Sequence, residues 1–417
     1  MNENKTNGFP TKIFIGLLLL SGIGGYFLLN IQGLFYVPVS EYFGVARSTF
    51  SLYYTAQCAG AFIGASFAGT IISKYKRQMP ILIFMAAVVQ FMGYFLFSKA
   101  QSVSVFFIVA PFLGIAGAFD TQMIMGLVLA NWFNKKNGLI LGIVTAFSSL
   151  FGALIAPSIT VLANADWRTG YFVIGCGVLA SVGVSALLLR FSPELFNRKA
   201  WGADEIETSS VEKPEDSMSG VSYNVALKSP AFYCCFLVLF FTLSWSCFYV
   251  AVPGYVASIG HSARVIGLCA SAYMVGGLIG KLSVGWLNDK LGYLKAISIS
   301  AAFGIVGMLL LIFCGNLHSF APVIGTALFG IANANANIFP PILTKKCFGN
   351  KDYAKIYSNV QMATWLASMV MIPLYNAFYD LVGSYVPGMF IVIVIELLAI
   401  GCSVLALRYS KDLVWED

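Results

Sequence analysis

The sequence carries too little charge for a soluble globular protein. Only 10% of its 417 residues are Asp, Glu, Lys or Arg, whereas a soluble domain has about 25%. Hydrophobic residues make up 59% of the chain, and the mean hydropathy is +0.81. A composition this apolar indicates a protein that is surrounded by lipid.

Several kinds of chemistry lack the residues that they need. The only histidines, His261 and His318, lie far apart, so the sequence shows no catalytic or metal-binding cluster, and we expect neither an enzyme nor a cofactor. The nearest approach to a phosphate-binding loop is Gly280-Lys281. It lacks the glycine five places earlier and the following hydroxyl residue, which argues against an ATP-driven pump. The basic residues are spread thinly, so nucleic acid is not an expected partner.

Long apolar runs dominate the chain. A helix that crosses the hydrocarbon core needs about 20 mostly apolar residues, and the sequence contains about twelve such runs separated by short polar breaks. The predicted fold class is therefore an all-α integral membrane protein of about twelve transmembrane helices. The predicted spans are 13–37, 50–72, 79–98, 104–130, 139–163, 169–191, 231–257, 264–288, 294–314, 319–343, 355–378 and 384–408.

The basic residues of the loops predict the orientation. Most of them fall in alternate loops, as the positive-inside rule requires. The pattern includes Lys135-Lys136 after the fourth span and Lys345-Lys346 after the tenth. We therefore expect a multi-pass protein of a plasma or bacterial inner membrane, with both termini in the cytoplasm.

The chain divides around its longest polar stretch. Residues 192–230 are rich in acidic residues and proline and are predicted to form a cytoplasmic linker. It would join an N-terminal six-helix bundle (1–191) to a C-terminal one (231–417). Because the paired lysines repeat in the two parts, an internal duplication is the simplest interpretation. It predicts two pseudo-symmetric six-helix bundles, an architecture of secondary transporters.

One loop carries a family resemblance. Gly285, Asp289, Gly292 and Lys295 are spaced like the conserved loop between the second and third helices of a half in the major facilitator superfamily. The chain therefore resembles this superfamily, which implies a conformational role for Gly285, Asp289 and Gly292. The first-half copy departs from the pattern, with Ser73 in place of the aspartate and Lys76 in place of the second glycine.

Two further loops resemble one group within that superfamily. The stretch 131–139 (NWFNKKNGL) and the stretch 166–171 (DWRTGY) are similar to loops of the oxalate/formate antiporter and monocarboxylate transporter group. This resemblance implies a small organic anion as the substrate.

Three charged residues lie inside predicted spans and away from the span ends, namely Asp120, Lys281 and Glu396. Such a residue costs about 2.5–3.5 kcal/mol near the bilayer centre, so it usually faces a bundle interior or a cavity. Lys281 falls where the resembled group carries a substrate-binding arginine, and Thr364 falls where its oxalate carriers have a lysine. The site would thus hold one cation where the oxalate carriers have two, which suits a substrate with a single negative charge. The alternative is that Lys281 snorkels along its helix.

The two carboxyl groups have different interpretations. Asp120 is a candidate for proton coupling, because burial favours the protonated form of a carboxyl group. It would alternatively be a permanent partner of Lys281, or a hydrogen-bonding group that fastens two helices. For Glu396 we expect a structural or lipid-interface role.

Uncharged polar residues inside the spans are further candidates for binding the substrate. They would donate hydrogen bonds to an anion, although each is also explained by hydrogen bonding between helices. The candidates are Asn30, Gln32, Tyr273, Asn333, Asn337, Gln361 and Thr364.

These features together predict a secondary transporter that moves a small organic anion, a monocarboxylate, by alternating access. The coupling would be proton symport or anion exchange, and the expected partners are the anion, protons or a counter-anion, and the lipid bilayer. The protein is expected to work as a monomer. The alternative is a proton-coupled exporter of cationic or amphipathic compounds, with Asp120 as the recognition group.

Overall fold

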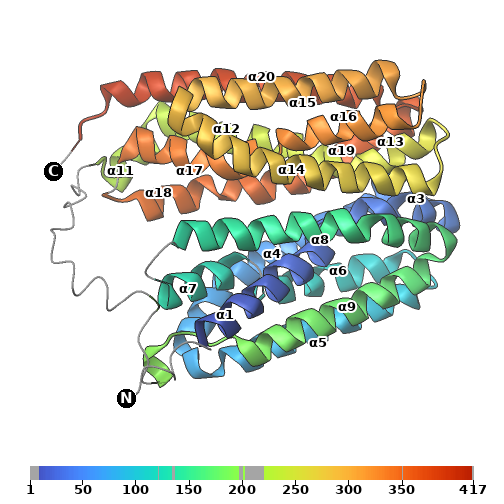
Figure 1. The fold of residues 1–417 in the computed structure, drawn as a ribbon, viewed down its shortest axis with the longest axis horizontal. Helices are drawn as coiled ribbons and strands as arrows, with labels where there is room; N and C mark the ends of the chain where they lie inside the picture. The colour runs from blue at the N-terminus through green and yellow to red at the C-terminus, as the bar shows by residue number, and fades with distance from the viewer. Residues whose placement is uncertain are drawn as a thin grey trace. The chain divides into compact units, whose positions relative to one another are not determined.

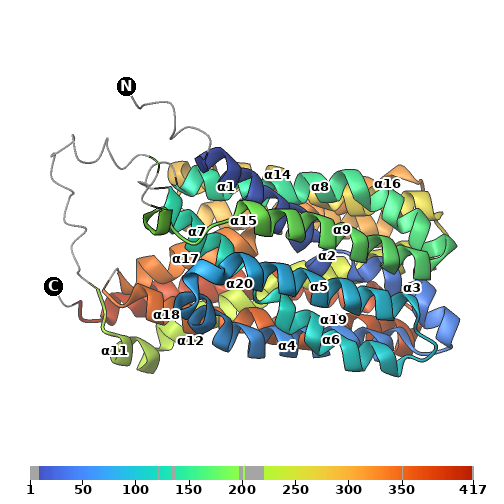
Figure 2. The same ribbon diagram turned by 90° about the horizontal axis from the view of Figure 1, so that it is seen from below.

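The computed structural model describes residues 9–120, 122–133, 137–196, 201, 220–349 and 351–415. Regular structure in these residues is helical apart from two isolated β-bridges (Figures 1 and 2). The predicted all-helical fold is therefore confirmed. Lys135, Lys136 and most of the predicted linker 192–230 lie outside the described residues.

The chain forms two compact units. The first consists of Met1–Val45 and Leu52–Val211, and the second of Ala46–Ser51 and Glu212–Asp417. The helices up to η4 are α1 (Phe9–Leu17), η2 (Leu18–Gly24), α2 (Gly25–Leu29), α3 (Gln32–Phe43), α4 (Arg47–Lys74), η3 (Lys76–Gln78), α5 (Met79–Ser98), α6 (Ser104–Gly117), α7 (Gln122–Trp132), α8 (Asn137–Ala165), α9 (Trp167–Leu188) and η4 (Glu194–Phe196).

The remaining helices belong to the second unit. They are α11 (Tyr223–Lys228), α12 (Pro230–Cys247), η5 (Phe248–Ala251), α13 (Val252–Ser258), α14 (Ala263–Leu291), α15 (Tyr293–Cys314), α16 (Phe320–Ile331), α17 (Ala334–Phe348), α18 (Tyr353–Val360), α19 (Met362–Val382), α20 (Val386–Tyr409) and η6 (Ser410–Asp412).

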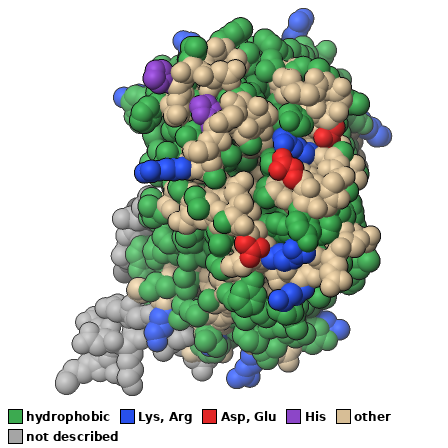
Figure 3. All heavy atoms as spheres, turned by 90° about the vertical axis from the view of Figure 1, so that its right-hand side faces the viewer, with side chains coloured by type: hydrophobic (Ala, Val, Ile, Leu, Met, Phe, Trp, Pro, Cys, Tyr) green, Lys and Arg blue, Asp and Glu red, His purple; other side chains and the backbone are tan. Residues whose placement is uncertain are grey.

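Nine helical stretches in the described residues are long and apolar enough to cross a membrane. Large apolar side chains are also exposed, such as Leu154 on α8 and Leu187 on α9. Because water would disfavour so many exposed apolar side chains, they indicate contact with lipid. Figure 3, which views the right-hand end of Figure 1, shows basic, acidic and histidine side chains among the hydrophobic ones.

Four of the predicted spans are interrupted: 13–37 between α2 and α3, 355–378 between α18 and α19, and the fourth span of each half. In place of a continuous helix over 104–130, α6 ends at Gly117 and α7 begins at Gln122. In place of one over 319–343, α16 ends at Ile331 and α17 begins at Ala334. The amides at each interruption bond three residues back, as in Phe119 N–H to Ala116 O at 2.9 Å and Asn335 N–H to Ala332 O at 2.9 Å. This tighter bonding breaks the regular α-helical ladder.

Glycines bring the backbones of α14 and α16 into direct contact. A Cβ placed on Gly276 would lie 1.9 Å from the carbonyl oxygen of Ala327, and one on Gly280 would lie 2.3 Å from that of Ile331. On the opposite helix, a Cβ on Gly330 would lie 2.3 Å from the carbonyl oxygen of Tyr273. Small residues permit this close approach, as is common between helices in membranes.

The same contacts recur between α4 and α6 in the first unit. A Cβ on Gly60 would lie 2.1 Å from Pro111 O, one on Gly64 2.9 Å from Ile115 O, and one on Gly114 1.9 Å from Gln57 O. Every residue of this set has its counterpart 216 positions later in the α14–α16 set, from Gly60 and Gly276 to Gln57 and Tyr273. The two units therefore repeat the same packing of a second helix against a fourth, which supports an internal duplication.

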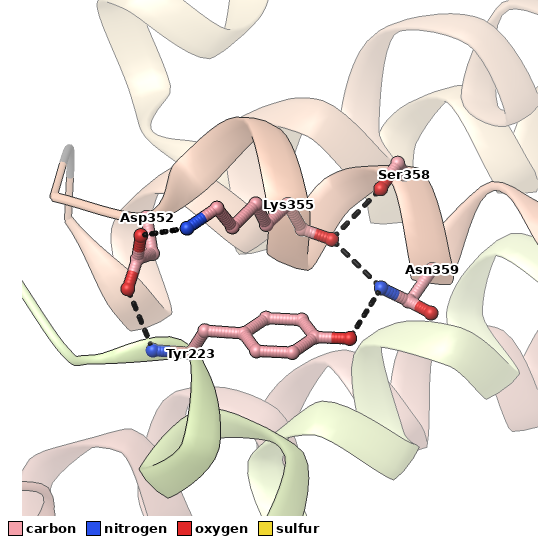
Figure 4. A network of polar contacts seen from close by, with 5 residues as sticks. All are labelled: Tyr223, Asp352, Lys355, Ser358 and Asn359. Carbon is pink, nitrogen blue, oxygen red and sulfur yellow. Dashed lines mark hydrogen bonds and ion pairs between the residues drawn. The ribbon is translucent and has the colours of Figure 1, made fainter.

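Hydrogen bonds of Tyr223 hold the beginning of α11 in the second unit. Asp352 accepts a hydrogen bond from the backbone N–H of Tyr223 at 2.9 Å and pairs with Lys355 at 3.4 Å (Figure 4). Asn359 Nδ2 donates to the Tyr223 hydroxyl at 3.1 Å. The Tyr223 N–H bond is the main cause that lowers the pKa of Asp352, since it stabilises the charged form. These bonds hold α11 against α18.

Replacing Gly276 with alanine tests the close helix contact. The added methyl group has no room against the Ala327 carbonyl, so α14 and α16 must separate. We expect a loss of about 1–3 kcal/mol of stability, measured as a lower unfolding temperature of the purified protein in detergent. Gly401→Ala on α20 is the matched control, because no atom lies within 4 Å of the new Cβ. Equal stability of the two variants would contradict the packing described above.

Candidate transport site

Lys281 lies on α14, which is 29 residues long, and its side chain is partly buried. At 1.5 Å per residue, it stands about 6 Å from the middle of this helix. With α14 centred in a bilayer, the edge of the hydrocarbon core is a further 9 Å or so away. Lys281 would therefore lie within the hydrocarbon core, between its centre and one edge. The residues expected on its helix face, Ala270, Met274 and Gly277, are all buried.

Asn333 joins Lys281 in one region of the second unit. It occupies the interruption between α16 and α17, and its Nδ2 lies 3.4 Å from where a Cβ of Gly277 would stand. Gly277 is about one turn before Lys281 on α14. The close contact between α14 and α16 thus places Lys281 and Asn333, both predicted from the sequence to bind the substrate, in the same region.

Tyr273 is on the same helix but is packed among aromatic side chains. Its ring stacks on Tyr249 with centroids 4.0 Å apart and an interplanar angle of 10°. Its hydroxyl donates to the carbonyl of Ser246 at 3.5 Å. The residue is buried, and its carbonyl is the one that meets Gly330, so it also belongs to the α14–α16 contact.

Three other predicted residues of the second unit bond to near neighbours. Asn337 Nδ2 donates to the carbonyl of Asn333 at 3.2 Å. Gln361 Nε2 donates to the hydroxyl of Tyr357 at 2.9 Å, and Gln361 Oε1 accepts from Thr364 at 3.0 Å. Asn337 and Gln361 are exposed and Thr364 is partly buried. Each bond is local, so these side chains remain near the surface of the unit.

In the first unit, Asn30 ends α2 and is partly exposed, whereas Gln32 is buried at the start of α3. Gln32 Nε2 donates to the carbonyl of Leu28 at 3.0 Å, and Gln32 Oε1 accepts from the Tyr53 hydroxyl. Gln57 donates to the same carbonyl at 3.2 Å. Nε2 of Gln32 therefore bonds across the interruption between α2 and α3, while its Oε1 connects α3 to Tyr53 of α4.

Asp120 lies in the interruption between α6 and α7 and is only 4% exposed. Its Oδ2 accepts a hydrogen bond of 2.6 Å from Nε2 of Gln90 on α5. The hydrogen bond between helices, one of the three interpretations left open by the sequence, is thus present. Gln90 was not identified from sequence, because a single glutamine in an apolar run does not reveal which carboxyl group it meets.

Glu396 lies on α20 and is completely buried, with 0% exposure. Its Oε1 accepts a hydrogen bond of 2.6 Å from Nδ2 of Asn335, in the first turn of α17. Of the structural or lipid-interface role expected for Glu396, this buried position contradicts the lipid-interface alternative and fits the structural one. Apolar residues are distributed around the whole circumference of α20. The sequence therefore does not reveal which face of this helix packs against α12, α15 and α17. Asn335 was also missed.

The loop after α14 has the geometry that its motif requires. Gly292 ends the helix with φ at +80°, and its N–H bonds to the carbonyl of Asn288 at 3.0 Å. This left-handed backbone favours glycine. Gly285 is partly buried within α14. Asp289 is exposed and accepts a bond of 3.4 Å from Asn288, so its carboxylate is accessible for a conformational contact.

Two plant proteins are similar in sequence to part of this chain. It is 25% identical over 228 residues to "Putative glycerol-3-phosphate transporter 5" of Arabidopsis thaliana, which covers 47% of this chain and 45% of that protein. It is 29% identical over 195 residues to "Putative glycerol-3-phosphate transporter 1" of the same plant, covering 40% and 36%. The chain thus matches less than half of the length of either relative.

Solved transporter structures share the fold over nearly the whole chain. A bacterial homolog of the human lysosomal transporter Spinster matches with a TM-score of 0.70 at 12% identity, covering 98% of this chain and 99% of that one. A D-xylose-proton symporter matches with a TM-score of 0.68 at 15% identity, covering 96% and 97%.

The sequence profile of the Major Facilitator Superfamily matches residues 18–243 and residues 234–414. These matches take in both repeated units and the loop around Asp289. The chain therefore belongs to the Major Facilitator Superfamily and is a multi-pass membrane transporter rather than an enzyme.

Proposed function

We propose that this transporter carries a small organic anion, and that Lys281 binds the anionic group. The observation that supports the proposal is a lysine on α14 about 6 Å from the middle of this helix, which is long and apolar enough to cross a membrane. A charge at that depth is costly, and an arriving anion offsets the cost. The two plant relatives are named for glycerol-3-phosphate, which is also a small organic anion.

The anionic group is a carboxylate or a phosphate. The loops at 131–139 and 166–171 favour the carboxylate, as in the monocarboxylate group, whereas the plant relatives favour the phosphate. Lysine binds either as a point charge, without the planar fork by which arginine grips a carboxylate at two points. Asn333, on the opposite side of the α14–α16 contact, supplies an amide N–H as a second donor.

The transport cycle follows from charge compensation. Enclosing the positive charge of Lys281 in a low-dielectric region carries a desolvation penalty. A bound anion neutralises the site and lowers the cost of closure. Alternating access of the two units in a plasma or bacterial inner membrane, with both termini in the cytoplasm, would then move the anion as proton symport or anion exchange.

Lys281→Gln is expected to reduce anion uptake roughly 10- to 100-fold, because a hydrogen bond to a charged group contributes about 1.5–3 kcal/mol. The measurement is uptake into proteoliposomes that contain the purified variant. Lys281→Arg should retain uptake, since it keeps the charge. Lys228→Gln, which removes an exposed lysine of α11, is the matched control. Undiminished uptake by Lys281→Gln would refute the assignment.

Asp120→Asn tests proton coupling in the first unit. The amide keeps the shape of the carboxyl group but cannot carry an exchangeable proton. If Asp120 is the coupling group, a pH gradient should no longer stimulate uptake, while anion exchange without a gradient should persist. Asp412→Asn, at an exposed carboxyl in η6, is the control. An unchanged response to the gradient would leave Asp120 only its structural bond to Gln90.

The alternative function is a proton-coupled exporter of cationic or amphipathic compounds, with Asp120 as the recognition group. Competition experiments in wild-type proteoliposomes separate the two functions. Formate, lactate, pyruvate and glycerol-3-phosphate should compete with the substrate of an anion carrier, whereas lipophilic cations should compete only with that of the exporter.

A further inference from the structure

Each unit buries one carboxyl group against a carboxamide at the interruption of its fourth helix. In the first unit, Asp120 lies within the interruption between α6 and α7 and bonds to Gln90. In the second, Asn335 follows the interruption between α16 and α17 and bonds to Glu396 of α20. Both donor–acceptor distances are 2.6 Å.

The second pair is incomplete as a hydrogen-bonded unit. Asn335 Nδ2 donates to Glu396 Oε1, but Glu396 Oε2 and Asn335 Oδ1 are both buried without a partner among the described residues. Two bare acceptor oxygens would be an unfavourable arrangement in a site that excludes water. A proton on Oε2 turns that atom into a donor, and Asn335 Oδ1 is the acceptor that would complement it.

In the described part of the chain, Glu396 makes no ion pair. Lys346 of α17 comes close to the neighbouring Tyr293, with Nζ 5.8 Å from the centroid of the Tyr293 ring. Tyr293 of α15 is the ionisable side chain that interacts electrostatically with it, and the Tyr293 hydroxyl bonds to Ser403 at 3.1 Å. Cys235 of α12 and Cys347 of α17 lie near Tyr293 in turn. The lysines of the packed helices stand at helix ends, with Lys295 in the first turn of α15 and Lys345 and Lys346 in the last turn of α17.

We propose that Glu396 and Asn335 form a proton-binding site in the second unit, in which Glu396 is held as a neutral carboxylic acid. The acid would donate Oε2–H to Asn335 Oδ1 while accepting Nδ2–H on Oε1, so that two hydrogen bonds close the pair. The site is separate from Lys281 and does not depend on the identity of the transported anion.

The position of the site couples the proton to the interrupted helix. Asn335 is the second residue of α17, and its own N–H bonds three residues back to Ala332. A change at the Ala332–Asn333 interruption would therefore move the amide relative to Glu396. Separation of the pair removes both hydrogen bonds of the acid and exposes it to exchange. The proton would be held or released according to the geometry of this interruption.

Infrared spectroscopy of the purified protein in lipid, without substrate, tests this proposal. The wild type should show a carbonyl band of a protonated carboxylic acid at neutral pH, and Glu396→Gln should lose that part of the band. Asp120→Asn is the matched control, because it removes the carboxyl group of the other pair and should leave the Glu396 contribution in place. A band that Glu396→Gln leaves unchanged would overturn the proposal.

Thermal unfolding gives a second readout. Glutamine can make both hydrogen bonds of the pair at any pH, so Glu396→Gln should fold with an unfolding temperature close to that of the wild type at acid pH. Ionisation of the buried acid should lower the wild-type unfolding temperature as the pH rises, and this part of the pH dependence should be lost in Glu396→Gln. An equal pH dependence in both proteins would contradict a protonated Glu396. Neither experiment measures anion uptake, so their failure is distinguishable from failure of the Lys281 assignment.

Discussion

The structure depends on the direct contact between the backbones of a second and a fourth helix within each unit. Gly276, Gly280 and Gly330 allow α14 and α16 to meet without intervening side chains, and Gly60, Gly64 and Gly114 do the same for α4 and α6. Without a hydrophobic driving force between helices in lipid, such close packing is a main source of association. The contact also fixes where the fourth helix is interrupted relative to its neighbour.

The contact between α14 and α16 determines which polar side chains lie near it. Lys281 follows Gly280 by one residue, and Asn333 lies beside Gly277 at the interruption that begins after α16. The register of the repeat relates Lys281 to Ala65 in the first unit, so the duplicated packing carries the lysine in one copy only. The common scaffold is thus symmetric, whereas the charge proposed to bind the anion is not. This asymmetry suits a site that binds a single small anion.

The two buried carboxyl groups share one kind of hydrogen-bonding partner. Asp120 and Glu396 are each placed against a carboxamide, although the partners come from α5 in one unit and α17 in the other. A carboxyl group in a water-free region needs a hydrogen-bonding partner, and an amide satisfies it without adding charge. Both pairs stand at interrupted helices, where a change of backbone geometry alters the bond. The proposed proton site at Glu396 would thereby link protonation to the geometry of the interruption between α16 and α17.

Much of this protein could be predicted from the sequence alone. The low charge and the long apolar runs determined an all-helical membrane fold, and the loop around Asp289 with its Gly292 indicated the superfamily, because these signals are local in the chain. Lys281 was recognisable as an intramembrane charge for the same reason. The partners of Asp120 and Glu396 were not recognisable, since Gln90 and Asn335 are distant in sequence and ordinary in their local context. The interruptions after Gly117 and Ile331 also escaped prediction. Polar residues such as Asp120 and Asn333 flank them, but such residues also occur in continuous membrane helices, where they bond to a neighbouring helix. Only the packing of one helix against another decides where such a helix breaks and which polar side chains it brings together.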